Sequence, residues 1–156
     1  MTPEEFFEAY QDSLDDDHPH LDADFTAWSF GDNPDLIKTL LNLVLEGKKT
    51  ATSSCAWEYE VDQEDLPQVG ELSVILDSNG IPACIIETTE VRVMPYGEVD
   101  SQFAADEGEG DLSLMYWREA HWRWFSRVLP KIGREPTQDM PIVCERFQVI
   151  FKRKSL

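Results

Sequence analysis

Residues 36–52 read LIKTLLNLVLEGKKTAT, an apolar run that ends in two lysines and two threonines. Its leucine, isoleucine and valine residues recur at intervals of three and four, the spacing of one buried helix face. Asp32 or Asn33 can cap the start of this helix, and Pro34 suits its first position. Gly47 suits its end, because glycine adopts the left-handed backbone conformation cheaply. We therefore predict a helix that leads into residues 47–52, called here the lysine loop.

The lysine loop is the densest basic spot in a strongly acidic chain. The 156 residues include 13 Lys and Arg against 31 Asp and Glu, a formal net charge of −18. Such a field repels polyanions and argues against broad or duplex nucleic-acid binding, but a local basic cleft remains compatible with it. Lys48 and Lys49 have two interpretations at this point. They complement the negative end of the helix dipole, or they meet a ligand.

The remaining composition indicates one globular domain over residues 1–156, with residues 1–27 as an N-terminal helical extension. No apolar run approaches the roughly 20 residues of a membrane span, and the acidic N-terminus is unlike a signal peptide. Cys55, Cys84 and Cys144 are far apart among apolar residues, so we expect reduced thiols in a cytoplasmic protein. No cysteine or histidine pair has zinc-ligand spacing, and we expect neither a metal nor a cofactor.

Periodicity predicts helices over 3–16 and 112–128, and strands over 55–61, 71–77, 82–94 and 142–151. The strand over 55–61 rests on Cys55, Trp57, Tyr59 and Val61, which alternate with more polar residues. The turn Asp77-Ser78-Asn79-Gly80 predicts an antiparallel hairpin between 71–77 and 83–93, because Asn-Gly supplies the positive φ angles of tight turns. The class is therefore α+β, built on an antiparallel meander.

The helix over 112–128 carries two polar residues on its apolar side. On a helical wheel, Arg118 and His121 fall among Trp117 and Trp124. A buried arginine needs a carboxylate partner, and the candidates are Glu87, Glu109 and Glu145. His121 is either a hydrogen-bonded core residue or part of a site, and the sequence leaves both readings open.

Residues 107–111, Glu-Gly-Glu-Gly-Asp, form an acidic loop with three interpretations. It is a solvated helix cap, or a calcium loop, although it lacks the EF-hand ligand pattern, or a catalytic carboxylate that faces the lysine loop. We expect the two loops to meet, since a carboxylate best neutralises adjacent lysines in so acidic a chain. In the third reading Lys49 keeps a glutamate ionised, while a partly desolvated lysine loses its proton near neutral pH and serves as nucleophile or base.

Residues 47–52, GKKTAT, resemble the G-x-K-x-x-T signature of the ASCH-domain family, relatives of the PUA domains. The likeness continues in order and spacing over roughly residues 28–152 and is closest to the longer, single-domain bacterial form. Its further blocks are Trp57-Glu58-Tyr59-Glu60, Gly70-Glu71-Leu72-Ser73, Ile86-Glu87-Thr88-Thr89-Glu90-Val91, Glu107-Gly108-Glu109-Gly110-Asp111, Tyr116-Trp117-Arg118-Glu119-Ala120-His121 and Cys144-Glu145-Arg146-Phe147. The resemblance implies a PUA-like, partly closed antiparallel β-barrel of about five or six strands with surrounding helices.

The resemblance also implies a site. Small ASCH relatives are known as amidohydrolases of N4-acylated cytidine that use the motif lysine and threonine and a downstream glutamate. These fall on Lys49, on Thr52, and on Glu107 or Glu109, of which we prefer Glu109 as the catalytic residue. The substrate-binding residues we expect are Lys48, Thr50, Trp57, Tyr59, Glu107, Arg118 and His121.

Members that resemble the longer form are reported as single-strand ribonucleases or are only inferred to bind RNA. The leading hypothesis is therefore binding of a nucleotide or short single-stranded RNA in a local basic cleft, with hydrolysis. The alternatives are a nucleoside amidohydrolase and a non-catalytic module that binds RNA or protein; a homodimer stays open. As a surface charge, Lys49 should contribute no more than about 1 kcal/mol to folding stability.

Overall fold

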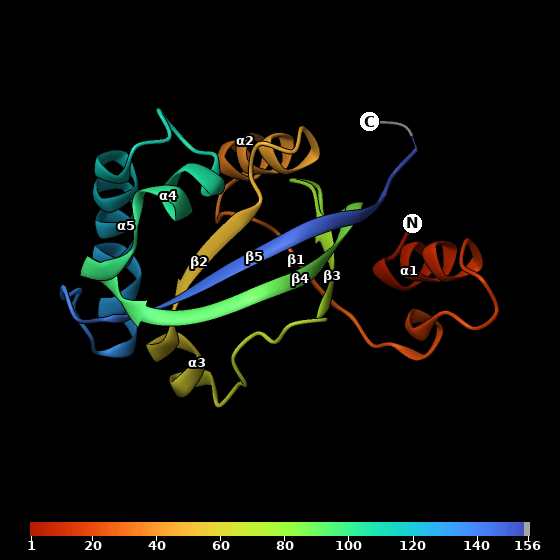
Figure 1. The fold of residues 1–156 in the computed structure, drawn as a ribbon, viewed down its shortest axis with the longest axis horizontal. Coiled ribbons are helices and arrows are strands. Elements are labelled where there is room, and N and C mark those ends of the chain that lie inside the picture. Colours follow the sequence, from red (N-terminus) through yellow and green to blue (C-terminus); the bar gives the residue numbers. More distant parts are fainter. Residues whose placement is uncertain (155–156) are drawn as a thin grey trace.

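The computed structural model describes residues 1–154 and has one five-stranded sheet at its centre (Figure 1). The strand order is β1-β3-β4-β5-β2. The strands are β1 (Thr26–Trp28), β2 (Ala51–Cys55), β3 (Leu72–Leu76), β4 (Pro82–Pro95) and β5 (Pro141–Lys152). The sheet is a half-barrel, which confirms the α+β class and the partly closed barrel. It is not wholly antiparallel, however, because β1 pairs with β3 in parallel.

The hairpin between β3 and β4 is confirmed. Leu72 lies opposite Glu87 and Val74 opposite Ile85 in an antiparallel pair. The Asp77 carboxylate accepts hydrogen bonds from the amides of Asn79, at 2.8 Å, and Ile81, at 3.0 Å. These bonds close the turn without other parts of the protein, which is why the local sequence was enough to predict it.

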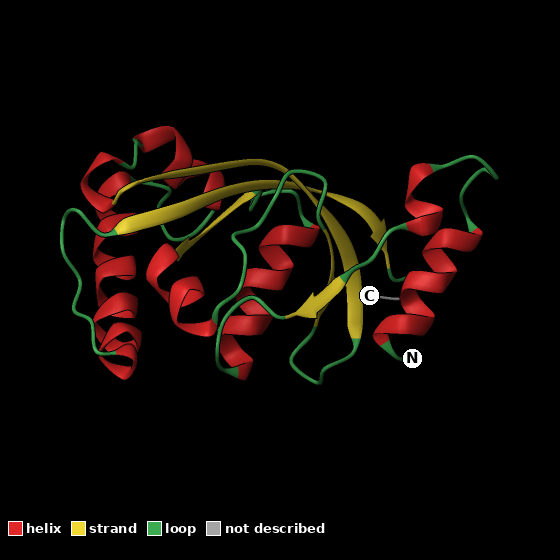
Figure 2. Ribbon diagram, turned by 90° about the horizontal axis from the view of Figure 1, so that it is seen from below, coloured by secondary structure: helices red, strands yellow, loops and turns green. Residues whose placement is uncertain are grey.

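Within the described residues, five helices surround the half-barrel. They are α1 (Pro3–Asp12), α2 (Pro34–Leu45), α3 (Ala56–Asp62), α4 (Ser101–Glu107) and α5 (Leu114–Val128), with 3-10 turns at Pro19–Asp22, Tyr96–Glu98 and Leu129–Ile132. Figure 2 shows the sheet arching over α2 and α3, with α5 at one end of the molecule and α1 at the other. Within residues 1–154, none of the helices has the length and apolar character to cross a bilayer.

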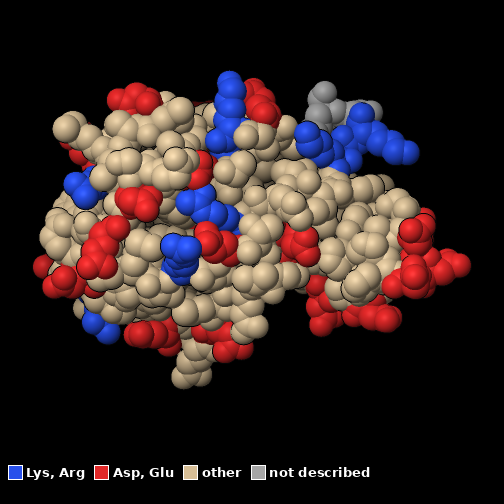
Figure 3. Space-filling view, in the orientation of Figure 1, with Lys and Arg blue, Asp and Glu red and all other residues tan. Residues whose placement is uncertain are grey.

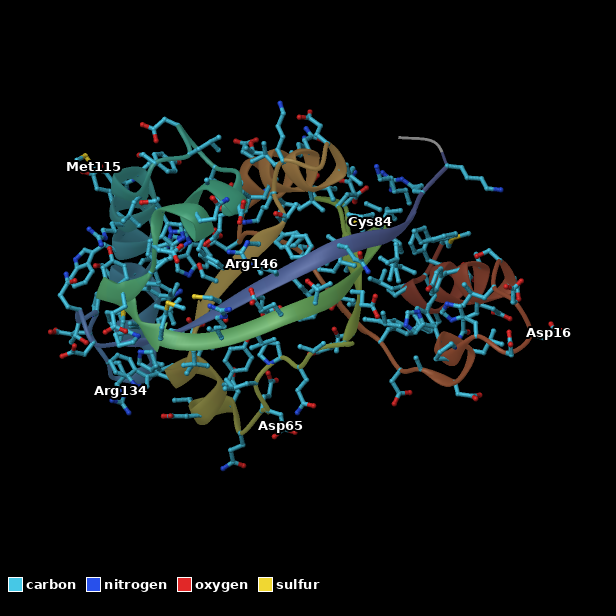
Figure 4. All side chains as sticks on the ribbon, in the orientation of Figure 1. Asp16, Asp65, Cys84, Met115, Arg134 and Arg146 are labelled. Carbon is cyan, nitrogen blue, oxygen red and sulfur yellow. The ribbon has the colours of Figure 1, made fainter. Side chains whose placement is uncertain are left out.

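The predicted strand over 55–61 is wrong, because β2 ends at Cys55 and α3 begins at Ala56. Seven residues with period-two alternation do not distinguish a strand from a short helix, and tertiary packing decides. Trp57 packs on the core beside α5. The guanidinium of Arg134, which is labelled in Figure 4, lies 4.5 Å from the centre of the Trp57 ring. Val61, the last residue of the supposed alternation, is exposed.

The core forms three apolar clusters around the sheet. The α2 helix buries Leu40, Leu41 and Val44 against one of them, as its periodicity predicts. The α1 helix buries Phe6 and Phe7 against β3 and β4, so the N-terminal segment is packed on the sheet. All three cysteines are buried, free thiols. Figure 3 shows acidic side chains gathered at the α1 end, where α1 and the turn after it carry exposed Asp and Glu.

Candidate active site

The two lysines of the lysine loop have opposite environments. After α2 the chain turns through Gly47, at φ +77°. Lys48 then points to solvent, where its ammonium lies 3.0 Å from Glu46. Lys49 points inward and is only 2% exposed. Its Nζ donates to Glu107 Oε1 at 3.0 Å and to Glu109 Oε2 at 3.0 Å. The predicted meeting of the lysine loop with the acidic loop is therefore confirmed.

Backbone contacts fix this meeting. The amide of Thr50 donates to the carbonyl of Asp106 at 2.8 Å. Gly108 has a φ of +75°, and a Cβ added there would lie 2.4 Å from the carbonyl oxygen of Lys48. Only glycine permits so close an approach of the two chains in this conformation. The acidic loop thus brings its two glutamates to Lys49 through backbone that is in direct contact with the lysine loop.

Glu107 is the most enclosed acid of the site. Its carboxylate accepts from Ser53 Oγ at 2.7 Å and from the indole Nε1 of Trp117, and it lies 3.4 Å from His121 Nε2. Burial alone would raise the pKa of Glu107, but Lys49, His121 and the two hydrogen-bond donors outweigh it and lower this pKa to about 2. Glu107 is therefore an ionised carboxylate whose oxygens are all engaged by the protein.

Glu109 is the freer of the two acids. Within residues 1–154 its carboxylate has one polar partner, the Lys49 ammonium, and its side chain is 22% exposed. It lines a cavity, and so do Lys49 and Thr52. Glu107 therefore holds the lysine, whereas Glu109 can meet a ligand. This difference separates the two acids that the sequence alone left as alternatives.

The burial of Lys49 corrects two expectations. Desolvation lowers the pKa of a buried lysine, but Glu107 and Glu109 together outweigh it, so the pKa of Lys49 is raised. Lys49 is thus an ammonium near neutral pH, and the expectation that it loses its proton there is wrong. Its supposed surface location is also wrong, because the ion pair with Glu107 is almost completely buried.

The cavity at this site, called the lysine cavity, has a volume of about 400 Å³. Its polar lining includes Lys49, Glu107, Glu109 and His121, together with Thr52, Ser53 and Ser54 of β2. Its aromatic lining comes from Trp28, Phe30, Tyr116 and Trp124. Two arginines of α5 also line it: Arg127, which pairs with Asp32 at 2.8 Å, and Arg123.

Several residues expected to bind substrate lie outside the lysine cavity. Thr50 is hydrogen-bonded to Asp106, and Lys48 is turned toward solvent. Trp57 is covered by Arg134. Tyr59 lines a second cavity, where its hydroxyl lies 3.2 Å from that of Ser54.

The prediction that Arg118 faces inward is wrong. The α5 helix buries Trp117 and Phe125, whereas Arg118 is exposed and has no ion pair with any residue between 1 and 154. His121 lies between Trp117 and Phe125 along the helix, and its ring stacks on that of Trp117 with 4.3 Å between the ring centroids. A wheel drawn from sequence places Arg118 at the margin of the apolar face, where a small rotation decides its exposure.

Sequence reasoning missed Ser53, Trp28 and Arg123. Ser53 follows the signature threonine, and the alternation of a strand would have placed it on the opposite side from Thr52. Trp28 was not among the expected site residues. Arg123 was not among them either, and it lies at an exposed position that is also part of the cavity lining.

The sequence from residue 26 to residue 151 matches the family model of the ASCH domain. The chain belongs to the ASCH-domain family. This domain is a PUA-like fold associated with RNA binding. A search of the curated proteins finds no significant match.

Two solved structures support the assignment. An ASCH domain from Lactobacillus crispatus JV V101 is 36% identical and superposes with a TM-score of 0.89, covering 95% of this chain and 93% of its own. A protein from Enterococcus faecalis V583 is also 36% identical, with a TM-score of 0.83 and coverages of 96% and 88%. The similarity to both structures therefore includes the N-terminal segment that precedes the family match.

Proposed function

We propose that this ASCH domain binds one nucleoside unit in the lysine cavity and hydrolyses a bond placed against Lys49 and Glu109. The observation that carries the proposal is the environment of Glu109. Its carboxylate lies 3.0 Å from the buried Lys49 ammonium, and the rest of that carboxylate faces the cavity. A volume of about 400 Å³ lies within the range of small-molecule sites. The aromatic side chains in the lining suit a planar base.

The roles follow from the protonation states. Glu109 accepts a proton from the attacking water and acts as general base. The Lys49 ammonium and the Thr52 hydroxyl stabilise the oxyanion that forms on the attacked carbonyl. Glu107 positions Lys49 and keeps it charged. Lys49 is therefore an electrostatic group in this proposal, and its raised pKa argues against a role as nucleophile.

The charge at this centre favours a neutral bond over a phosphodiester. Lys49 contributes +1 and Glu107 and Glu109 contribute −2, so the three side chains sum to −1. A phosphate placed against them would be repelled, whereas an amide would not. The reaction that the geometry supports best is hydrolysis of an acyl group on the amino nitrogen of a base. Water adds to the acyl carbon, the C–N bond breaks, and the proton held by Glu109 passes to the departing amine.

A second candidate, cleavage of single-stranded RNA, is favoured by α5. Arg123 is exposed, lines the lysine cavity and has no ion pair within the described residues. The Arg127 guanidinium lies 4.9 Å from the ring centre of Trp124. An arginine beside an aromatic ring is a combination that meets phosphate and base in single-stranded ligands.

Incubation of the protein with N4-acetylcytidine and with single-stranded RNA oligonucleotides, followed by chromatography of the products, tests the proposal. We expect release of acetate and cytidine, and loss of that activity in Thr52→Val. The matched control is Thr39→Val, at an exposed position on α2, which should keep the activity. RNA cleavage without deacylation would select the second candidate. Turnover of neither substrate, with nucleoside binding retained, would identify a non-catalytic module.

A further inference from the structure

A second cavity, of about 500 Å³, lies beside the lysine cavity. All five strands contribute a hydroxyl or carboxyl side chain to it: Thr26 of β1, Thr52 of β2, Ser73 of β3, Thr88 of β4 and Glu145 of β5. The segment after β2 supplies further polar residues, among them Tyr59 and Asp65, the latter labelled in Figure 4. A half-barrel held together only by its core would not need such a polar set across its sheet.

Two of these side chains have no polar partner among residues 1–154. Glu145 is 9% exposed and Thr88 is 3% exposed. Between residues 1 and 154, the structure contains no hydrogen bond or ion pair for the Glu145 carboxyl, and no hydrogen bond for the Thr88 hydroxyl. Neither group is sealed off, because within residues 1–154 the one fully enclosed side-chain nitrogen or oxygen without a partner is Arg153 Nε. Both residues line the second cavity, so their unpaired oxygens open into it and can bind a ligand there.

The second cavity is continuous in its lining with the lysine cavity. Trp28, Thr52, Ser53 and Ser54 line both. Thr52 of β2 is also the direct cross-strand partner of Glu145 of β5. Such partners share one face of a sheet, with Cβ atoms about 5 Å apart. Glu145 therefore lies one strand away from the threonine that we place at the reaction centre.

The lining restricts the chemistry of the ligand. The second cavity has carboxyl groups from Glu64, Asp65, Glu71 and Glu145, and no Lys, Arg or His of the described part of the chain lines it. A phosphate would be repelled. A neutral ligand with several hydroxyl groups fits, because vicinal hydroxyls donate to a carboxylate and exchange hydrogen bonds with Ser, Thr and Tyr. Hydrogen bonding of a ribose hydroxyl by an acidic side chain has the same basis in dinucleotide sites.

We propose that the second cavity binds the ribose of a nucleoside through Glu145 and Thr88 while its acylated base lies in the lysine cavity. The position of the base rests on the proposed function. The ligand class that follows is a ribonucleoside without a 5′-phosphate. Burial, and to a smaller extent Glu71, raise the pKa of Glu145 to about 7, and no cationic side chain of the described residues lines the cavity to oppose this.

Calorimetric titration with cytidine, 2′-deoxycytidine and cytidine 5′-monophosphate tests the inference, because none of these ligands carries the acyl bond. Wild-type protein should bind cytidine about tenfold tighter than 2′-deoxycytidine, and the monophosphate more weakly than cytidine. Glu145→Ala and Thr88→Val should each bring the ratio between cytidine and 2′-deoxycytidine close to one. Glu98→Ala, at an exposed position outside both cavities, should leave it unchanged.

Equal affinities in wild-type protein, a ratio that persists in both variants, or tight binding of the monophosphate would overturn the inference. Thr88→Val preserves side-chain shape, so it keeps the test informative if Glu145→Ala does not fold. The outcome is separable from that of the proposed function. A ribose preference without hydrolysis would remove the reaction and keep the ribose site. Hydrolysis without a ribose preference would keep the reaction and remove the ribose site.

Discussion

Gly108 lies against Lys48 so closely that a Cβ at Gly108 would come within 2.4 Å of the Lys48 carbonyl oxygen. This contact brings the acidic loop to the lysine loop, and it places Glu107 and Glu109 on the Lys49 ammonium. The structure of the site thus depends on a residue with no side chain.

Replacement of Gly108 measures that dependence. Gly108→Ala should lower the free energy of unfolding in urea by about 2–4 kcal/mol, because it adds a backbone clash to the cost of an L-residue at positive φ. Gly133→Ala is the matched control, since Gly133 has the same φ of +75° and nothing within 4 Å of an added Cβ. It should cost only about 1 kcal/mol. Equal losses in the two variants would mean that the loops do not touch as described.

Removal of Lys49 should be costly, contrary to the expectation for a surface lysine. Lys49→Met leaves the Glu107 carboxylate buried without its cation, and should lower the free energy of unfolding by about 3–5 kcal/mol. The double variant Lys49→Met/Glu107→Gln removes both charges and should be more stable than the single variant. If the loss of unfolding free energy in the double variant equals the sum of the losses in Lys49→Met and Glu107→Gln, the two side chains are not coupled.

Glu107 should make stability depend on acid pH. Its folded pKa, about 2, lies below its ordinary value of 4.5. The native state therefore holds the proton more weakly than the unfolded state. The contribution is complete above about pH 4.5 and is lost as pH falls toward 2. Urea unfolding between pH 2 and 6 should show that the free energy of unfolding falls less with decreasing pH in Glu107→Gln than in wild type. Parallel curves for the two proteins would contradict the depressed pKa.

Glu145 should have the opposite effect near neutral pH. Its folded pKa, about 7, exceeds its ordinary value of 4.5, so the native state holds the proton more tightly. Stability then falls as pH rises from about 4.5 to 7, by on the order of 2–3 kcal/mol. Glu71, Glu64, Asp65 and Tyr59 share its cavity, and none supplies a positive charge. Glu145→Gln should abolish this loss. A wild-type stability that stays level between pH 5 and 8 would oppose the assignment.

Local signals in the sequence were sufficient for part of this structure. The turn from Asp77 to Gly80 bonds to itself, and α2 carries its own cap and apolar face, so both were predictable. The meeting of Lys49 with the acidic loop followed from charge balance and from the family resemblance. The helical state of Trp57, the exposure of Arg118 and the burial of Lys49 depend on packing between distant segments. The spacing of apolar residues within one segment does not reveal how that segment packs against distant ones.

The most direct test of the central claim is the rate of N4-acetylcytidine hydrolysis by Glu109→Gln. If Glu109 is the general base, this variant should fold as wild type and bind cytidine with unchanged affinity. Its kcat should fall by about 10²–10⁴-fold, the contribution typical of a positioned base. A kcat within about threefold of wild type would contradict the assignment of catalysis to the lysine cavity.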